Sequence, residues 1–338
     1  DRIVNRGIAV LIGSIDTTYA GFIPWNIDQW GGLVSPVDKP TPTGVTIRNM
    51  LILGPSDGIY VWSSSGNTIE GNTIRNTTPL GGAGIIVYQG GTGNVIQGNS
   101  VLNAAGDAVA ICGVWPDGFL DVGGTQVLSN DLVDSANGLK FYNVADPDGR
   151  GVVALYNVIS GNVNGLLVEG GHATVPDAHY NSISGNTGYG ALNNDPSGDF
   201  DASLNWWGDA SGPSGVGPGA GDAISANVIY SPWLGLAPDG DAGTAGVQIT
   251  GPVVIVVDDV GPAPAGGYLD AAIGGSNDAM LPYEDAILVM DGDYTASTAL
   301  TDGVALTSSC GACKTSITGS LAVNTDNTTI GQIREGFT

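Results

Sequence analysis

Aspartate pairs in short turn-like segments are the residues of this sequence whose types and spacing most directly suggest chemistry. Closely spaced carboxylates can supply the oxygen ligands that calcium prefers, although aspartate is also a common turn former. Calcium is therefore the one ion that the sequence suggests, and no other cofactor is expected. The candidate ligands are Asp146, Asp148, Asp195, Asp199, Asp239, Asp241, Asp291 and Asp293.

The two histidines offer a second candidate metal site. His172 and His179 flank Pro176 and Asp177 in a segment that reads as an insertion. A metal centre would need further ligands at suitable spacing, and the sequence does not identify them. We therefore expect both histidines to lie in a solvent-exposed loop without an ion.

The tryptophans fall into two groups by position. One group lies in closing segments, where large rings can cover the apolar end of a stack of strands; a platform that stacks on sugars is the alternative. The other group lies in insertions and supplies candidates for contacts with a neighbouring fibre or a glycan. The first group is Trp206, Trp207 and Trp233, and the second is Trp25, Trp30 and Trp115.

The cysteines are too few to staple the fold. Cys310 and Cys313 are close in sequence, and we expect a local disulfide between them in an oxidising compartment. A redox centre would need a thioredoxin-like βαβ pattern, and a zinc site would need two more ligands. Neither accompanies the pair. Cys112 stands alone, and the sequence does not determine its state.

Composition and charge exclude several classes of partner. Nine Lys and Arg residues oppose 33 Asp and Glu residues, which gives a formal net charge of −24. Such a charge repels nucleic acids, anionic membranes and polyuronates such as pectin. The apolar run at 252–257 is far too short to insert into a bilayer. Because the sequence begins at Asp1 without a visible signal peptide, we interpret it as a mature or excised segment, extracellular or at a cell surface.

A short sequence motif that ends in asparagine recurs along the chain. It indicates which elements position the candidate site residues. Phrases such as 67–72 and 94–99 recur at intervals of 23 to 31 residues, a period typical of solenoids. Asparagine tolerates the left-handed conformation at a coil corner, and its amide can bond to the same amide in the next coil. We therefore predict a structural ladder without a catalytic role. Its members are Asn49, Asn72, Asn99, Asn130, Asn157 and Asn181.

A second short apolar segment follows each phrase, usually after a glycine. Examples are the segments 58–61, 84–87 and 165–168. Alternating polar and apolar residues predict strands, and the Gly and Asn turns leave no room for a helix between them. The predicted fold is all-β, with one coil of a parallel β-helix per repeat.

Two groups of segments carry a family resemblance, in an unexpected order. A Trp-Trp-Gly segment, a Gly-Pro turn and a Ser-Pro-Trp-Leu segment lie at 204–208, 211–213 and 230–234. A strand ending in two aspartates, a short helical segment and an acidic strand-turn follow them, at 255–259, 268–273 and 286–294. The first group resembles the closing elements, and the second the opening elements, of right-handed parallel β-helix proteins of the pectin-lyase-like superfamily.

This resemblance implies a right-handed single-stranded parallel β-helix (solenoid), with a short capping-helix segment near residues 267–274. It also implies three regions. Residues 1–234 would be the β-helix body and its closing segment, 235–247 an acidic Gly-rich linker, and 248–338 the opening segment of a following β-helix.

If Thr338 were followed directly by Asp1, the recurring strand-and-turn pattern would continue across the junction. An uncapped solenoid end exposes a strand edge and an apolar core, so we predict that units stack head to tail, covalently in tandem or as separate subunits. The predicted subunit interface contains Asp1, Ile3, Val4, Asn5, Ile8, Val10, Ile330, Ile333 and Phe337.

These patterns predict a structural subunit or repeat of an extracellular filament or surface fibre whose partner is another copy of itself. A carbohydrate-binding or adhesive module is the alternative, and a polysaccharide hydrolase or lyase is the second alternative. Asp258-Asp259 and Asn324–Asp326 are similar to polygalacturonase motifs but occur in the wrong order, and Gly171-His172 lacks the second glycine. Since hydrolysis needs two carboxylates across a groove, we expect no catalytic residue and no enzyme.

Overall fold

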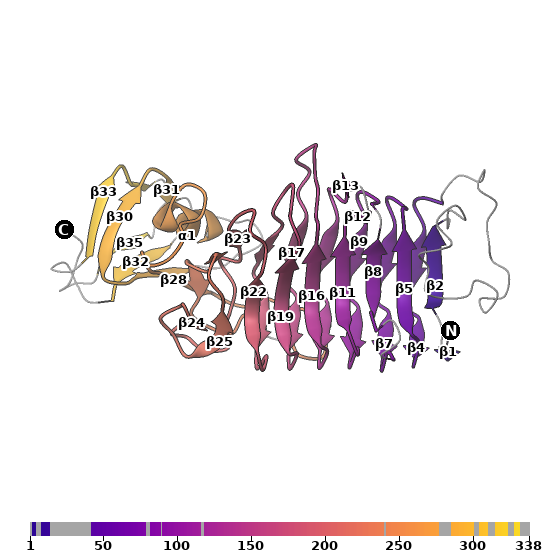
Figure 1. The fold of residues 1–338 in the computed structure, drawn as a ribbon. Helices are drawn as coiled ribbons and strands as arrows, with labels where there is room; N and C mark the ends of the chain where they lie inside the picture. Colours follow the sequence, from indigo (N-terminus) through magenta and orange to yellow (C-terminus); the bar gives the residue numbers. More distant parts are fainter. Residues whose placement is uncertain are drawn as a thin grey trace. The chain divides into compact units, whose positions relative to one another are not determined.

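The computed structural model is all-β apart from one short helix among the residues that it describes (Figure 1). The described residues are 2–4, 8–13, 42–78, 82–88, 90–115, 118–239, 241–276, 285–300, 304–309, 315–323 and 328–331. The chain forms two compact units. Unit 1 comprises Asp1–Val153, Leu166–Pro176 and Asn194–Ser197, and unit 2 comprises Ala154–Gly165, Asp177–Asn193 and Gly198–Thr338.

Unit 1 is a parallel β-helix in which the chain visits three sheets in turn (Figure 1). The first sheet contains β1 (Arg2–Val4), β4 (Leu51–Leu53), β7 (Thr73–Arg75), β10 (Ser100–Leu102) and β15 (Asp131–Val133). The second contains β2 (Ile8–Gly13), β5 (Asp57–Trp62), β8 (Ile85–Tyr88), β11 (Asp107–Cys112) and β16 (Asn137–Tyr142). The third contains β3 (Thr46–Arg48), β6 (Thr68–Glu70), β9 (Val95–Gln97) and β14 (Gln126–Leu128). A hairpin of β12 (Val114–Trp115) and β13 (Gly118–Phe119) interrupts this cycle.

The alternation of the short strands builds the core of unit 1. The central residues of four neighbouring strands lie in direct register and are fully buried, namely Ile52, Ile74, Val101 and Leu132. Parallel strands lie about 4.8 Å apart, so each coil buries its apolar side chains against the coils on either side. A continuous column of aliphatic side chains results.

Unit 2 contains further coils of the same kind. Its parallel pairs and sheets are β18 (Val158–Ser160) with β21 (Ser182–Ser184), β20 (Asp177–His179) with β23 (Phe200–Asp201) and β26 (Val228–Ile229), and β22 (Tyr189–Asn193) with β25 (Gly221–Ile224) and β24 (Pro213–Gly215). Two strands, β17 (Val153–Leu155) and β19 (Asn164–Glu169), have residues in both units.

The C-terminal part of unit 2 repeats the three-sheet arrangement. Parallel strands form the series β28 (Val254–Val257), β29 (Ala286–Val289), β32 (Ala305–Ser308) and β35 (Thr329–Ile330), and the pairs β30 (Gly292–Ala296) with β33 (Thr315–Gly319) and β31 (Ala299–Leu300) with β34 (Ala322–Val323). Helix α1 (Tyr268–Ser276) follows β28, which confirms the capping helix predicted near 267–274. Strand β27 (Trp233–Leu234) pairs antiparallel with β28.

One hydrophobic core joins the closing and opening segments inside unit 2. Leu204 and Leu234 belong to the same buried cluster as Ile255 of β28 and Leu269 of α1. The predicted linker at 235–247 therefore lies within unit 2, where both of its flanking segments pack into that shared core.

Stacked asparagine side chains close one corner of the coils. In unit 1, Asn72 Nδ2 donates to Asn99 Oδ1 at 2.9 Å, and Asn99 Nδ2 donates to Asn130 Oδ1 at 2.9 Å. In unit 2, the equivalent column runs through Asn157, Asn181 and Asn205, with distances of 2.9 and 3.0 Å. The ladder geometry predicted from the sequence is present within each unit.

The residue before each ladder asparagine, rather than the asparagine itself, is left-handed. The φ angles of Gly71, Gly98 and Ser129 are 61°, 61° and 51°. The ladder asparagines that follow them do not have positive φ. The predicted left-handed role of these asparagines was therefore wrong, and their contribution is the side-chain hydrogen bonding.

Asn49 does not belong to the ladder. Its φ is 56°, and its N–H donates to Glu70 O just as the N–H of Gly71 donates to Gln97 O. Met50 takes the ladder position, because its N–H donates to Asn72 Oδ1 at 3.0 Å. The prediction for Asn49 was wrong by one residue, since asparagine suits both the left-handed position and the ladder position.

Candidate functional sites

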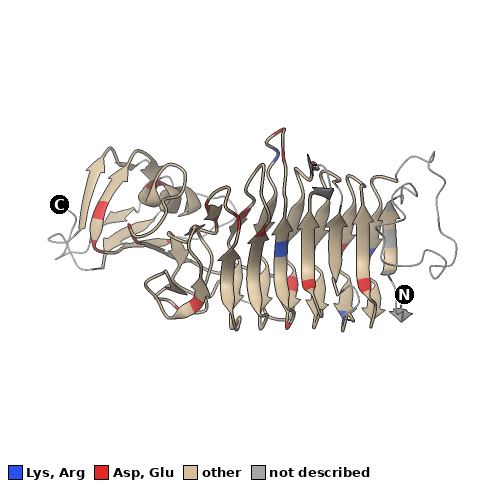
Figure 2. Cartoon of the chain, viewed as in Figure 1, with Lys and Arg blue, Asp and Glu red and all other residues tan. Residues whose placement is uncertain are grey.

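Asp146 and Asp148 surround a guanidinium group. Arg150 Nε lies 3.5 Å from Asp146 Oδ1, and Arg150 Nη2 lies 3.5 Å from Asp148 Oδ2 and also contacts Asp121. Burial lowers the pKa of Arg150, but the hydrogen bond and charge of Asp121, with the charges of Asp148 and Asp146, raise it overall. Arg150 thus supplies the positive charge at the turn where calcium was predicted. Lys and Arg side chains are sparse over the rest of the described chain (Figure 2).

Asp195 is buried and occupied by hydrogen bonds. Its Oδ2 accepts from His172 N at 3.0 Å and from Ser197 Oγ at 2.7 Å, and its Oδ1 accepts from Ser197 N at 2.8 Å. A carboxylate that satisfies this many donors stabilises the fold of its loop. Asp199 lies nearby in sequence but is exposed.

The remaining aspartates of the predicted calcium set mostly cap turns or strand ends. Asp239 Oδ1 accepts from Asp241 N at 3.1 Å. Asp241 in turn accepts from Gly243 N and Thr244 Oγ1, and these bonds lower the pKa of Asp241. Asp293 accepts from Ser316 Oγ. Among the described residues, the eight predicted ligands, which include Asp291, are not brought into one converging group.

His172 lies in the interior of a stack of loops in unit 1. Its Nδ1 accepts the N–H of Val144 at 3.0 Å, and its Nε2 lies 3.5 Å from Asp195 Oδ2. Burial lowers the pKa of His172, and the charge of Asp195 opposes this only in part. The prediction of a solvent-exposed loop histidine was wrong, because the sequence does not show that loops of successive coils pack on one another.

His179 lies on strand β20 rather than in an insertion. Among the described residues, it forms with Asp177 and Asp201 the one group of candidate metal ligands whose atoms converge, all within 4.8 Å of one another. Burial raises the pKa of Asp177; the charge of His179 lowers it, and that of Asp201 raises it again. Asp201 was not predicted to join Asp177 and His179, although it lies 24 residues after Asp177, close to the coil period, and that spacing was an available signal.

Aromatic side chains line the outward positions of the second sheet in unit 1. The rings of Tyr60 and Trp62 stack with centroids 5.6 Å apart, and the Trp62 and Tyr88 rings meet edge to face at 5.3 Å. The three side chains are partly exposed. Tyr142 lies two strands further along the same row as Trp62 and Tyr88, with Cys112 between them.

Charged groups border this aromatic face. Asp57 and Asp107 begin β5 and β11, and burial raises the pKa of both carboxyl groups. Lys140 Nζ lies 2.9 Å from Glu169 Oε2 and 5.3 Å from the ring centroid of Tyr142. The sequence analysis did not identify this face, although aromatic residues at alternate positions, as in Tyr60 and Trp62, were the available signal.

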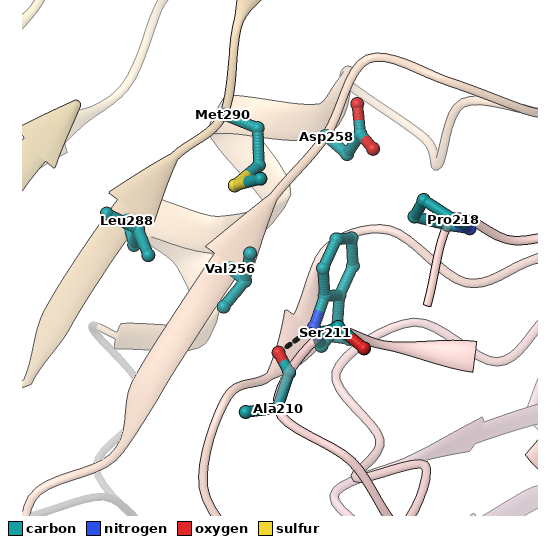
Figure 3. A pocket seen from close by; sticks show the side chains of 8 residues that line it. Ala210, Ser211, Pro218, Val256, Asp258, Leu288 and Met290 are labelled. Atoms are coloured by element: carbon teal, nitrogen blue, oxygen red, sulfur yellow. Dashed lines mark hydrogen bonds between the residues drawn. The ribbon is translucent and has the colours of Figure 1, made fainter. Parts of the chain in front are cut away.

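The closing segment of unit 2 contains two buried tryptophans and contributes to a small pocket, which Figure 3 shows. Trp207 and Trp233 are 0% and 1% exposed, and Trp233 Nε1 donates to Ala210 O at 3.1 Å. Such rings cover the core and do not form an open platform for sugars. Trp206 is partly buried against the hydrophobic cluster that contains Leu204 and Leu234. The pocket, of about 370 Å³, is lined by Ala210, Ser211, Pro218, Trp233, Val256, Asp258, Leu288 and Met290.

The last described coil of unit 2 exposes apolar residues that other coils bury. Ile330 of β35 is in register with Leu306, yet Ile330 is 47% exposed and Leu306 is 0% exposed. Val323 of β34 is likewise 45% exposed, whereas its partner Leu300 is 0% exposed. These side chains occupy core positions that no described coil covers.

The other predicted site residues lie on edge strands or outside the described residues. Val10 is partly buried on β2, the edge strand of its sheet among the described residues. Ile3, Val4 and Ile8 are described only as backbone of β1 and β2, and Trp115 only as backbone of β12. The predicted residues outside the described ones are Asp1, Asn5, Ile333, Phe337, Cys310, Cys313, Trp25 and Trp30.

The parallel coils define the chain as a β-solenoid. Comparison with known families identifies the family of β-solenoids to which it belongs. The family model for the right handed beta helix region matches residues 38–206, so the chain belongs to this family. No curated protein matched the sequence. Right-handed β-helix domains occur in both enzymes and non-enzymes. Among the described residues, no helix has the length and apolarity needed to cross a membrane.

Proposed function

We propose that the chain is a structural module of an extracellular filament or surface fibre, and that copies stack end to end through their terminal coils. The β-helix fold is consistent with a surface or structural module. The observation that carries the proposal is the exposure of Ile330 and Val323 at core positions of the last described coil. Covering each half-exposed side chain contributes roughly 1 kcal/mol.

The edge strands of the sheets also support a second copy of the chain as the partner. Strand β35 is the edge of its sheet among the described residues, and it pairs with β32 in parallel. An added parallel strand would continue both the hydrogen bonding and the apolar column. A second copy supplies such a coil, because β1, β2 and β3 are short parallel edge strands of unit 1. Since this contact joins two different surfaces, it propagates into a fibre.

Sedimentation velocity of the full chain tests the proposal. The wild-type chain is expected to form larger species as its concentration rises through the micromolar range, and electron microscopy is expected to show units joined end to end. The double variant Ile330→Asp with Val323→Asp is expected to remain a monomer. Val216→Asp is the matched control, because Val216 is 53% exposed away from this coil end. A wild-type monomer at these concentrations, or equal loss of association in the control, contradicts the proposal.

A carbohydrate-binding module is the second candidate, supported by the aromatic face of Tyr60, Trp62 and Tyr88. Exposed aromatic rings can lie against the apolar faces of sugar rings, and the net charge of −24 favours a neutral glycan. Titration with cellohexaose and laminarihexaose, followed by Trp fluorescence, tests this candidate. Trp62→Ala is expected to abolish the response, and Tyr189→Ala is expected to retain it. A response that survives Trp62→Ala, or no response in the wild type, rejects the candidate.

A further inference from the structure

Strand pairing fixes the positions of Asp177, His179 and Asp201. Asp177 of β20 is the direct register partner of Asp201 on β23. The intervening Ala178 and the neighbouring Phe200 are 0% exposed and point into the core. Since side chains alternate along a strand, Asp177, His179 and Asp201 share the outward face of these two strands. The backbone therefore holds the three side chains together.

The ligand atoms are close enough to share one ion. One ring nitrogen of His179 and one oxygen of each carboxylate lie within 4.8 Å of one another. In a tetrahedral zinc site with ligand atoms about 2.1 Å from the ion, two ligand atoms lie about 3.4 Å apart. Side-chain rotations that bring the ligand atoms closer by up to about 1.4 Å would complete the contacts.

A backbone carbonyl orients the imidazole ring. His179 Nδ1 lies 2.8 Å from the backbone oxygen of Ser203, two residues after Asp201. A hydrogen bond from the ring to a backbone carbonyl is the usual outer contact of a metal-binding histidine, because it fixes the tautomer and the ring orientation.

No lysine or arginine neutralises these carboxylates within the described part of unit 2. The two basic residues that unit 2 contains besides histidine, Lys314 and Arg334, lie outside the described residues. This contrasts with Asp146 and Asp148 of unit 1, whose cation is Arg150. Among the described residues of unit 2, the basic side chain beside the carboxylates of Asp177 and Asp201 is therefore that of His179.

We propose that Asp177, His179 and Asp201 bind a divalent transition-metal ion of the zinc class, with water in the remaining position. An imidazole with two carboxylates suits zinc, cobalt and nickel, whereas calcium takes oxygen ligands alone. The ion bridges β20 and β23 and ties two successive coils of unit 2. The site is independent of end-to-end stacking.

Metal binding to the full chain tests the site with Zn²⁺ and Co²⁺ as probes. Calorimetric titration of chelator-treated protein with Zn²⁺ is expected to show a binding event that His179→Ala and Asp201→Asn each weaken at least tenfold. Co²⁺ is expected to give visible absorption bands that Zn²⁺ displaces and excess Ca²⁺ does not. Asp199→Asn is the matched control, because Asp199 is an exposed aspartate two residues before Asp201.

The outcomes separate this site from binding elsewhere. The proposal is overturned if wild-type protein with intact far-UV circular dichroism does not bind Zn²⁺, or if both variants bind as tightly as the wild type. Displacement of Co²⁺ by equimolar Ca²⁺ would overturn the assigned metal class. If His179→Ala fails to fold, Asp201→Asn supplies the decisive comparison.

Discussion

Asn99 Oδ1 accepts two hydrogen bonds from Asn72, one from the backbone N–H at 3.0 Å and one from Nδ2 at 2.9 Å. Asn99 Nδ2 donates to Ile69 O and to Asn130 Oδ1, both at 2.9 Å. All of these contacts are buried, so a single side chain satisfies polar groups in the coils on both sides. These four hydrogen bonds tie the corner of the coil to both of its neighbours.

Asn99→Ala is expected to lower the free energy of unfolding by about 3 kcal/mol or more, because it leaves several buried polar groups without partners. Urea unfolding followed by far-UV circular dichroism measures the change. Asn103→Gly is the matched control. Asn103 has a positive φ that glycine tolerates, and its amide bonds to Asn76 on the exposed side, so a loss below about 1 kcal/mol is expected. Equal losses in the two variants would contradict the buried ladder as the main source of corner stability.

The coil period and the strand alternation made most of this fold predictable. Ile74 and Val101 are apolar at equivalent positions of their repeats. A local pattern of this kind can be recognised in each coil even though the lengths of the coils differ. The position of Asn49 was not predictable to one residue, because coil lengths vary. The neighbours of His172 and His179 depended on which loops and strands of successive coils come to face one another. Register between coils fixes those contacts, and of these the sequence shows only the 24-residue spacing between Asp177 and Asp201.

Gly84→Ala is expected to destabilise unit 1 by about 1–3 kcal/mol through overpacking. A Cβ at Gly84 would lie 2.3 Å from Val101 Cγ1 and 2.6 Å from Ala108 O, so the strand or its neighbour must move. Gly274→Ala in helix α1 is the contrasting variant, because nothing lies within 4 Å of its Cβ position. That change is expected to stabilise the protein by about 0.4–1 kcal/mol. Urea midpoints that move in the same direction for both variants would contradict this account.

Acidification is expected to destabilise unit 1 through His172. Its pKa is lowered in the folded chain, so the unfolded chain binds more protons between that lowered pKa and the ordinary value of about 6.5. Stability contributed by neutral His172 is therefore complete above about pH 6.5 and is lost as the pH falls below it. Protonation would also remove the hydrogen bond from Val144 N–H to Nδ1.

Two measurements check the role of His172. An NMR titration is expected to show His172 half-protonated below about pH 6.5. His172→Gln is expected to have a shallower loss of stability between pH 7 and pH 5 than the wild type, because the titrating group is gone. A pKa of His172 above its ordinary value, or the same dependence of stability on pH in the two proteins, would show that burial does not lower the pKa of this histidine.

Cys112 is expected to resist alkylation in the folded chain. Its side chain lies between Tyr88 and Tyr142 on the second sheet of unit 1, and burial raises the pKa of the thiol to about 12. The thiolate fraction at pH 7 is then roughly a thousandfold below that of a thiol with a pKa of 9. Iodoacetamide labelling with peptide mapping, which separates Cys112 from Cys310 and Cys313, is expected to show modification of Cys112 only in urea. Rapid labelling of Cys112 in native protein would mean that the aromatic face opens to solvent.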